Sequence, residues 1–411
     1  MATVLPFRGM RPLPALATDV AAPPYDVLSS DEARTQARGN RVSFLHISKP
    51  EIDCDPAVDV YSDAVYATGR ANIRRFIADG ILSPDASPCF YLYRQSLAEH
   101  SQTGIVGLVS VDEYENDIIR KHELTRPVKE NDRTRHMQAV QAQTGPVFLT
   151  YRAEPAIDAL MRECAAKEAV NDFTSDGVRH EFWAIEDAAA NSRIMALFEQ
   201  VPTLFVADGH HRSAAAVRYR ALRREANPGH TGKEPYNYFM AVLFPHDQLN
   251  ILGYHRVIQN LGEYNSESFL RALGEHFTVT ASEARQPDSS RQFSLYLDGH
   301  WYRLDFKEPA AGITDSVAQL DVSILQDYLL APLLGITNQR TDDRVDFIGG
   351  ARGLAALEKA VDNDGWAAAI ALHPVAIEQL MAIAGEGRLM PPKSTWFEPK
   401  LKSGLVIHKL D

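Results

Sequence analysis

In TLFVADGHHRSAAAVRY, residues 203–219, polar residues and a glycine separate an apolar run from an alanine-rich run. Residues 204–206 are an apolar run typical of a buried strand, and the alanine-rich run 214–219 is typical of a helix. Gly209 permits a tight turn and the close approach of a ligand, Ser213 is the expected helix cap, and both are predicted to bind phosphate. The polar residues between strand and helix are therefore expected at a helix N-terminus, where backbone N–H groups and the helix dipole favour an anion.

Five residues form this turn: Asp208, Gly209, His210, His211 and Arg212. Arg212 can hold phosphate oxygens with two N–H groups, and the imidazoles can donate to the same oxygens. Asp208, at the end of the strand, is the predicted Mg²⁺ ligand and a predicted catalytic residue. The alternative is a well-capped turn in which Arg212 pairs with an acid, but so many polar groups are costly unless they are used. No zinc site is expected, because adjacent histidines diverge.

A second polar stretch, RKHELTRPVKENDR, covers residues 120–133 and places Glu123 among several cations. Glu123 is predicted to act as a general base on an alcohol. An arginine stands where the zincin motif H-E-x-x-H has its second histidine, so a zincin is excluded. The alternative is a solvated, salt-bridged stretch. Pro127 and the missing apolar stripe favour an irregular loop over a regular helix. The predicted substrate or phosphate ligands here are His122, Thr125, Arg126 and Arg133.

A third stretch, RLMPPKSTWFEPKLKSGLVI, covers residues 388–407. Lys393, Ser394 and Thr395 are predicted to bind substrate or phosphate, and Lys400 is a further donor. A rigid connector anchored by residues 396–397 is an equal alternative. Nearer the N-terminus, PPYDV is expected to be a turn, although its Tyr25 is also a candidate for the wall of a pocket.

Composition and charge restrict the class of protein. The chain has 411 residues, 45% of them hydrophobic and 23% charged, which is typical of a folded, water-soluble protein. A formal net charge of -12 argues against nucleic acid as a partner. The three cysteines are widely spaced and suit free thiols. The sequence shows neither a signal peptide nor an apolar run long enough to span a membrane, so we expect a cytoplasmic protein.

The order of the expected elements favours an α+β fold. Hairpins are expected at residues 89–115 and 169–185, and helices at 155–169 and 188–200. This mixture predicts mixed and antiparallel sheets with helices, rather than a doubly wound parallel sheet. Domain boundaries are expected near residues 115 and 260.

Six motifs together resemble a known family. PFRGMRP, APPYDV, HELTRP with a later DR, GPVF, VADGHHR and MPPKST with a later SGL resemble domain of unknown function 1015 from end to end. The His-Glu pair and the later DGHHR turn also resemble free serine kinases built on the ParB/sulfiredoxin-type fold, over residues 105–225. This second resemblance implies that Glu123 activates a serine hydroxyl and that the DGHHR turn holds phosphates. With the boundaries expected near residues 115 and 260, the predicted regions are an N-terminal α/β region at 1–115, a core at 116–260 that resembles the ParB/sulfiredoxin phosphate-binding fold, and a C-terminal α+β region at 261–411.

These observations predict a small-molecule phosphotransferase that depends on Mg²⁺. The expected donor is ATP, ADP or pyrophosphate, and the expected acceptor is a small hydroxylated metabolite, with L-serine as the named candidate. The partners are thus a nucleotide or pyrophosphate and this metabolite, with a homodimer left open and neither membrane nor nucleic acid expected. Two alternatives remain: a nucleotide-sensing module without catalysis, and a phosphoester hydrolase that uses the same site.

Overall fold

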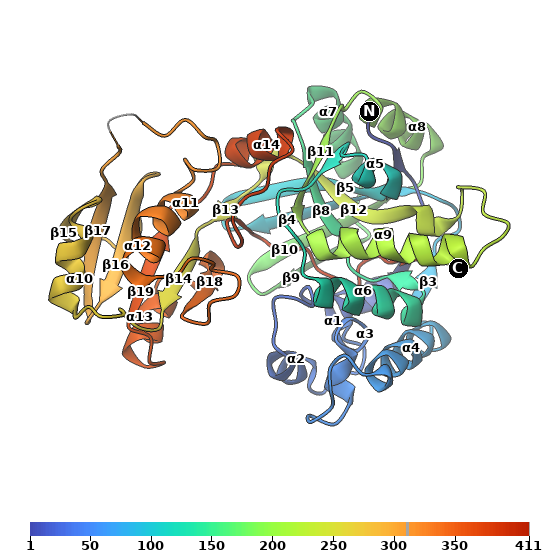
Figure 1. The fold of residues 1–411 in the computed structure, drawn as a ribbon. Helices are drawn as coiled ribbons and strands as arrows, with labels where there is room; N and C mark the ends of the chain where they lie inside the picture. Colours follow the sequence, from blue (N-terminus) through green and yellow to red (C-terminus); the bar gives the residue numbers. More distant parts are fainter. Residues whose placement is uncertain (310–311, 411) are drawn as a thin grey trace. The chain divides into compact units, whose positions relative to one another are not determined.

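Strand β11 (Leu204–Asp208) and helix α9 (His210–Glu225) are the two elements that residues 203–219 predict (Figure 1). The helix begins four residues earlier than the alanine-rich run suggests. Its N-cap is Gly209, with a φ of 101°, and Ser213 is therefore not the cap. Ser213 is instead buried in the first turn, where its hydroxyl donates to the carbonyl oxygen of Gly209 at 3.3 Å. His210, His211 and Arg212 consequently belong to the first turn of a 16-residue helix.

The structure describes residues 1–309 and 312–410, which form two units. Unit 1 comprises Met1–Lys121, Thr125–Leu249 and Pro399–Asp411. Unit 2 comprises His122–Leu124 and Asn250–Glu398. The expected boundary near residue 260 lies close to the start of the long segment of unit 2. The expected boundary near residue 115 lies inside unit 1, because strands from both sides of it pair in one sheet.

Unit 1 is built on a nine-stranded mixed sheet. Strand β11 pairs in parallel with β6, and β12 pairs in parallel with β8, whereas the other neighbours are antiparallel. Both expected hairpins are confirmed, as β4 with β5 and β9 with β10. In spatial order the strands are β6 (Ile119–Arg120), β11, β8 (Val147–Tyr151), β12 (Tyr238–Pro245), β5 (His100–Ser110), β4 (Phe90–Leu97), β10 (Val178–Ile185) and β9 (Asn171–Ser175), with β1 (Val4–Leu5) beside β5.

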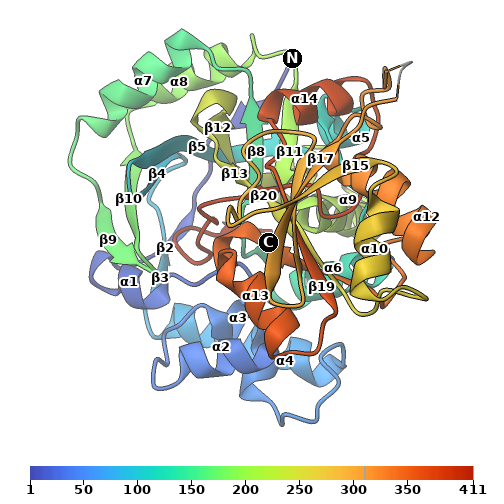
Figure 2. The ribbon, with the colours of Figure 1, turned by 90° about the vertical axis from the view of Figure 1, so that its left-hand side faces the viewer.

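Helices cover this sheet. Figure 2 shows α7 and α8 side by side, and their apolar residues join the sheet in one buried core. Strand pairs β2 (Met10–Pro12) with β3 (Leu82–Pro84) and β7 (Ala142–Gln143) with β21 (His408–Lys409) complete the unit. Besides α9, the α-helices of unit 1 are α1 (Ala17–Val20), α2 (Ser30–Ala37), α3 (Leu45–Ser48), α4 (Asp63–Ala78), α5 (Val111–Glu115), α6 (Pro127–Val140), α7 (Pro155–Ala165) and α8 (Ala188–Phe198).

Helix α6 corrects the expectation of an irregular loop after residue 126. Pro127 occupies the first helical position, where proline is tolerated because that N–H would have no partner within the helix. The helix lacks an apolar stripe because several of its buried side chains are polar, among them Asp132, Thr134 and His136. The helix therefore buries one face that hydrophobic periodicity does not reveal.

Unit 2 is built on a six-stranded antiparallel sheet in the order β15-β17-β16-β19-β14-β18. The protein as a whole is thus α+β, with mixed and antiparallel sheets, as predicted. The six strands of this sheet are β14 (Tyr254–Ile258), β15 (Phe277–Ala281), β16 (Gln292–Leu297), β17 (His300–Phe306), β18 (Val345–Gly349) and β19 (Ala368–Leu372). A separate antiparallel pair is formed by β13 (Ile251–Leu252) and β20 (Trp396–Phe397). The helices are α10 (Ser266–Leu273), α11 (Asp321–Leu325), α12 (Ala331–Leu334), α13 (Ala355–Asp362) and α14 (Ile377–Gly385). Among the described residues, none of the helices has the length and apolar character that a membrane crossing needs.

Candidate functional site

The turn between β11 and α9 depends on Gly209. Its φ of 101° is a conformation that other residues rarely adopt. A Cβ atom built on Gly209 would lie 3.2 Å from both Cζ and Nε of Arg212. The missing side chain therefore lets the guanidinium lie directly over the backbone of the turn. The pairing of β11 with β8 also shifts register between Val206 and Asp208, an irregularity that re-aims the last side chain of the strand.

Asp208 is held between two cations. Its Oδ2 accepts a hydrogen bond from Lys400 Nζ at 2.7 Å, and its Oδ1 lies 3.7 Å from Nη2 of Arg212. Burial alone would raise the pKa of Asp208, but the charges of Lys400 and Arg212 outweigh burial and hold the pKa well below its usual range. A carboxylate already paired with two cations fits a bound Mg²⁺ poorly, because both cations repel a divalent ion. The metal role of Asp208 stays a prediction, and its present partners favour a positioning role.

Arg212 carries the least satisfied polar group of the turn. Its side chain is 13% exposed, and one terminal nitrogen donates to the carbonyl oxygen of Pro146. Its Nε is buried and has no hydrogen-bond partner. Buried donors in folded proteins are nearly always paired, so such an exception asks for an explanation. A bound oxyanion would satisfy this donor at a helix N-terminus, which itself favours negative charge.

The start of α6 lies beside the first turn of α9. The backbone N–H of Arg126 donates to Nε2 of His211 at 3.1 Å. Further along the two helices, Arg218 of α9 and Glu130 of α6 form an ion pair at 2.6 Å. The structure therefore brings Arg126 next to the DGHHR turn, as the prediction of a shared site requires. Thr125, the preceding residue, donates its hydroxyl to Glu130.

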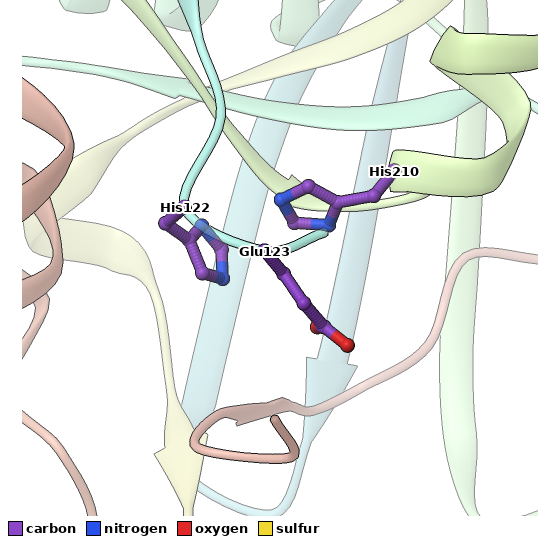
Figure 3. Close-up of side chains that lie close together, drawn as sticks. All are labelled: His122, Glu123 and His210. Carbon is purple, nitrogen blue, oxygen red and sulfur yellow. The ribbon is translucent and has the colours of Figure 1, made fainter. Parts of the chain in front are cut away.

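A cluster of three residues offers ligand atoms for a metal ion. One atom each from His122, Glu123 and His210 lies within 4.8 Å of the other two. Figure 3 shows the three side chains near one another, with His210 at the start of α9. Imidazole nitrogens and a carboxylate suit Zn²⁺, Mn²⁺ or Fe²⁺ better than Mg²⁺. Sequence spacing gave no hint of this cluster, because His210 is far from the other two residues along the chain.

A small cavity of about 40 Å³ lies beside Arg212, within unit 1. Arg133 is one of its lining residues. The guanidinium carbon Cζ of Arg133 lies 3.9 Å from the centroid of the Tyr25 ring, so the two groups stack. Arg133 also pairs with Asp132 at 2.8 Å, and this neighbouring charge outweighs the effect of burial and raises the pKa of Arg133. His136 lines the cavity too, and burial lowers its pKa to about 4. The imidazole is therefore neutral at pH 7, with Nε2 hydrogen-bonded to the carbonyl oxygen of Ile47 at 2.7 Å.

Lys393, Ser394 and Thr395 lie in unit 2, where the first two have local partners. The carbonyl oxygen of Lys393 accepts from the fully buried Arg256 at 3.0 Å, and the hydroxyl of Ser394 donates to the carbonyl oxygen of Pro391 at 2.6 Å. Burial lowers the pKa of Arg256 to about 9, and its hydrogen bonds go to neutral oxygens of this loop and its surroundings. These contacts support the connector interpretation, and a binding role for the three residues stays a prediction.

Several residues at the turn and its cavity stood outside the predicted site. The sequence motifs indicate Lys400 only as a further donor and Tyr25 only as a candidate for a pocket wall. They give no role to the cavity residues His136, Gln143 and Ser403. Tyr25 and Ser403 could have been found from the sequence, because they lie within the motifs APPYDV and SGL. His136 and Gln143 carried no such signal.

The protein is α+β, and the turn between β11 and α9 places Arg212 in the first turn of a helix. The chain belongs to the family described as Protein of unknown function (DUF1015), whose model matches residues 4–323. No curated protein sequence matches it significantly.

Several solved structures are similar at low identity. A conserved hypothetical protein from Pyrococcus furiosus has 11% identity and a TM-score of 0.35 over 72% of this chain and 94% of its own. A free serine kinase in complex with AMP has 11% identity and a TM-score of 0.35 over 71% of this chain and 86% of its own. SbnI with a C-terminal truncation, from Staphylococcus aureus, has 13% identity and a TM-score of 0.35 over 72% of this chain and 84% of its own. We carry no residue role over from these proteins.

Proposed function

We propose that this protein is a phosphotransferase that moves a phosphoryl group from a nucleotide or pyrophosphate to the hydroxyl of a small metabolite. The observation that carries the proposal is Arg212, a half-buried residue at a helix N-terminus whose buried Nε has no hydrogen-bond partner. Phosphoryl transfer asks a protein chiefly to position its reactants and to neutralise charge. A guanidinium beside the N-terminus of a 16-residue helix supplies both.

In this proposal the DGHHR turn holds the phosphates of the donor. The backbone N–H groups of the first turn, the guanidinium of Arg212 and the imidazoles of His210 and His211 would bind the oxygens. Because Nε2 of His211 accepts from Arg126, its other ring nitrogen carries the hydrogen in the neutral ring. Mg²⁺ enters the proposal only as the counter-ion that accompanies a nucleotide, and no step is assigned to it.

Glu123 is the proposed base. It would take the proton from the acceptor hydroxyl while that oxygen forms a bond to the terminal phosphorus of the donor. The bond between this phosphorus and its bridging oxygen breaks. The rest of the donor, which is ADP, AMP or phosphate for ATP, ADP or pyrophosphate, leaves with the electron pair. Glu123 stands three residues before Arg126, whose backbone N–H donates to His211 in the first turn of α9, and this supports a base close to the proposed phosphate site.

The test is turnover by the full-length protein. It is incubated with Mg²⁺, L-serine and, separately, ATP, ADP or pyrophosphate, and phosphoserine and free phosphate are measured by mass spectrometry and a phosphate assay. We expect phosphoserine with one of the donors, and a loss of roughly 100-fold or more in the Glu123→Gln variant, because general bases contribute at least that much. The exposed Glu199→Gln variant is the matched control and should keep the activity.

Two outcomes would select the alternatives. Phosphate release that does not depend on an acceptor would indicate a phosphoester hydrolase. Binding of a nucleotide without turnover, undiminished in Glu123→Gln, would indicate a sensing module.

A further inference from the structure

The cavity beside Arg212 carries several hydroxyl groups without a partner. Ser48 and Ser403 are 3% and 4% exposed, and both line the cavity together with Tyr25 and Thr144. The hydroxyl of Ser48 is buried and makes no hydrogen bond. Within the described part of the chain, the hydroxyls of Tyr25, Thr144 and Ser403 make none either. Four hydroxyl-bearing residues thus line one small space, and the buried, unpartnered hydroxyl of Ser48 favours a ligand with accepting oxygens.

The charges around the cavity favour a ligand with a single negative charge. Arg133 is compensated by Asp132, and Asp208 compensates only one of the two cations that contact it. His136 adds no charge at pH 7, because burial lowers its pKa to about 4. One positive charge therefore remains among these groups, and the exposed Asp26, next to Tyr25 in the chain, adds a negative charge outside the cavity lining.

The cavity is too small for a nucleotide. Its volume of about 40 Å³ compares with the roughly 300–1,000 Å³ of pockets that take drug-sized ligands, so it suits a group of only a few heavy atoms. A carboxylate with its adjoining carbon is of that size. Gly145 lines the same space, and a Cβ there would lie 3.3 Å from the hydroxyl oxygen of Ser403 and 3.7 Å from Nη1 of Arg212.

We propose that this cavity binds the carboxylate of the phosphoryl acceptor, which is therefore a hydroxy acid or hydroxy amino acid of two or three carbons. The inference rests on the proposed function and adds to it the class of acceptor and a set of residues outside the DGHHR turn. Tyr25, Thr144, Ser48 and Ser403 donate to the carboxylate. The acceptor hydroxyl is then directed toward Arg212, beside which the donor phosphate is bound.

The experiment compares an acid with its neutral amide of the same shape. Binding of glycolate and of glycolamide to the full-length protein is measured by calorimetry, with inorganic phosphate as a third ligand. We expect glycolate to bind at least about tenfold more tightly than glycolamide, because hydrogen bonds to a charged group are the stronger ones. Tyr25→Phe, which keeps the ring under Arg133, and Ser403→Ala should each reduce this preference several-fold. Tyr264→Phe, at a half-exposed tyrosine of unit 2, is the control and should keep it.

Three results would overturn the inference: equal binding of glycolate and glycolamide, a preference that survives in both variants, or tight binding of inorganic phosphate in place of glycolate at these residues. The acceptor assay separates this inference from the proposed function. Phosphoryl transfer to glycolamide as fast as to glycolate would overturn the carboxylate site and leave the phosphotransferase standing. Glycolate binding that requires Tyr25, without transfer from any donor, would leave the site standing and overturn the phosphotransferase.

Discussion

Lys400 Nζ donates to Asp208 Oδ2 at 2.7 Å, although 192 residues separate the two along the chain. The backbone of Lys400 is itself held in place, because the amide of the buried Gln95 donates to its carbonyl oxygen at 2.9 Å. The C-terminal segment thus completes the turn that β11 and α9 begin. This ion pair fixes the carboxylate that flanks Arg212 and leads to the first prediction.

The Lys400→Met substitution should destabilise unit 1 by about 2 kcal/mol at neutral pH, because it leaves a charged hydrogen bond unmade. The pair holds the pKa of Asp208 below its ordinary value of 3.8, so its contribution is complete above about pH 4. The contribution is lost as pH falls through the folded-state pKa. Urea unfolding of both proteins at neutral pH and at about pH 3 should therefore show a difference that narrows in acid.

Lys233→Met removes an exposed lysine of the same unit and serves as the control. A difference between Lys400→Met and the parent protein that stays constant with pH would rule out the ion pair as its source.

Gly209→Ala should cost about 1–2 kcal/mol of stability, because an alanine is strained at positive φ. It should also weaken the binding of phosphate ligands, since the new Cβ displaces the guanidinium of Arg212. Gly229→Ala is the matched control, because a Cβ there meets one side-chain oxygen at an ordinary 3.5 Å. Thermal unfolding and ADP titration check both effects, and an unstrained, fully binding Gly209→Ala protein would contradict the description of the turn.

His136 predicts a pH dependence of stability. Burial lowers its pKa from 6.5 to about 4, so the unfolded chain binds this proton more readily than the folded one. Stability should therefore fall as pH drops from about 6.5 to about 4, with up to roughly 3 kcal/mol from this residue. In His136→Gln the side chain offers an amide N–H donor in place of the ring N–H and does not titrate. The free energy of unfolding of this variant should therefore change less between about pH 6.5 and pH 4. His180, His255 and His408 also have pKa values lowered by burial, so a slope remains in the variant. Identical slopes for parent and variant would refute the assignment.

The local parts of the site could be predicted from the sequence. A strand, a glycine and an alanine-rich run predict the β11–α9 turn because each signal acts within a few residues. The helix nevertheless begins before the alanines, since His210, His211 and Arg212 occupy the first turn, where orphan N–H groups tolerate polar neighbours. Hydrophobic periodicity could not find α6, because its buried face includes Asp132, Thr134 and His136.

The long-range parts could not be predicted in this way. Nothing local to Lys400 indicates that it reaches Asp208, and nothing local to Tyr25 indicates that it stacks on Arg133. Such pairs are set by the packing of whole segments. The motifs APPYDV and SGL mark the segments involved, but they do not say what each side chain contacts.

In the proposed function, Arg212 and the start of α9 bind the phosphates of a nucleotide. The most direct measurement is calorimetric titration of the full-length protein with ADP in the presence of Mg²⁺, for the parent protein, Arg212→Gln and Arg224→Gln. Arg224 is exposed in the last turn of the same helix and is the matched control. We predict saturable binding that weakens at least about tenfold in Arg212→Gln and is unchanged in Arg224→Gln. Equal affinity of all three proteins for ADP, or no binding by the parent protein, would contradict the claim.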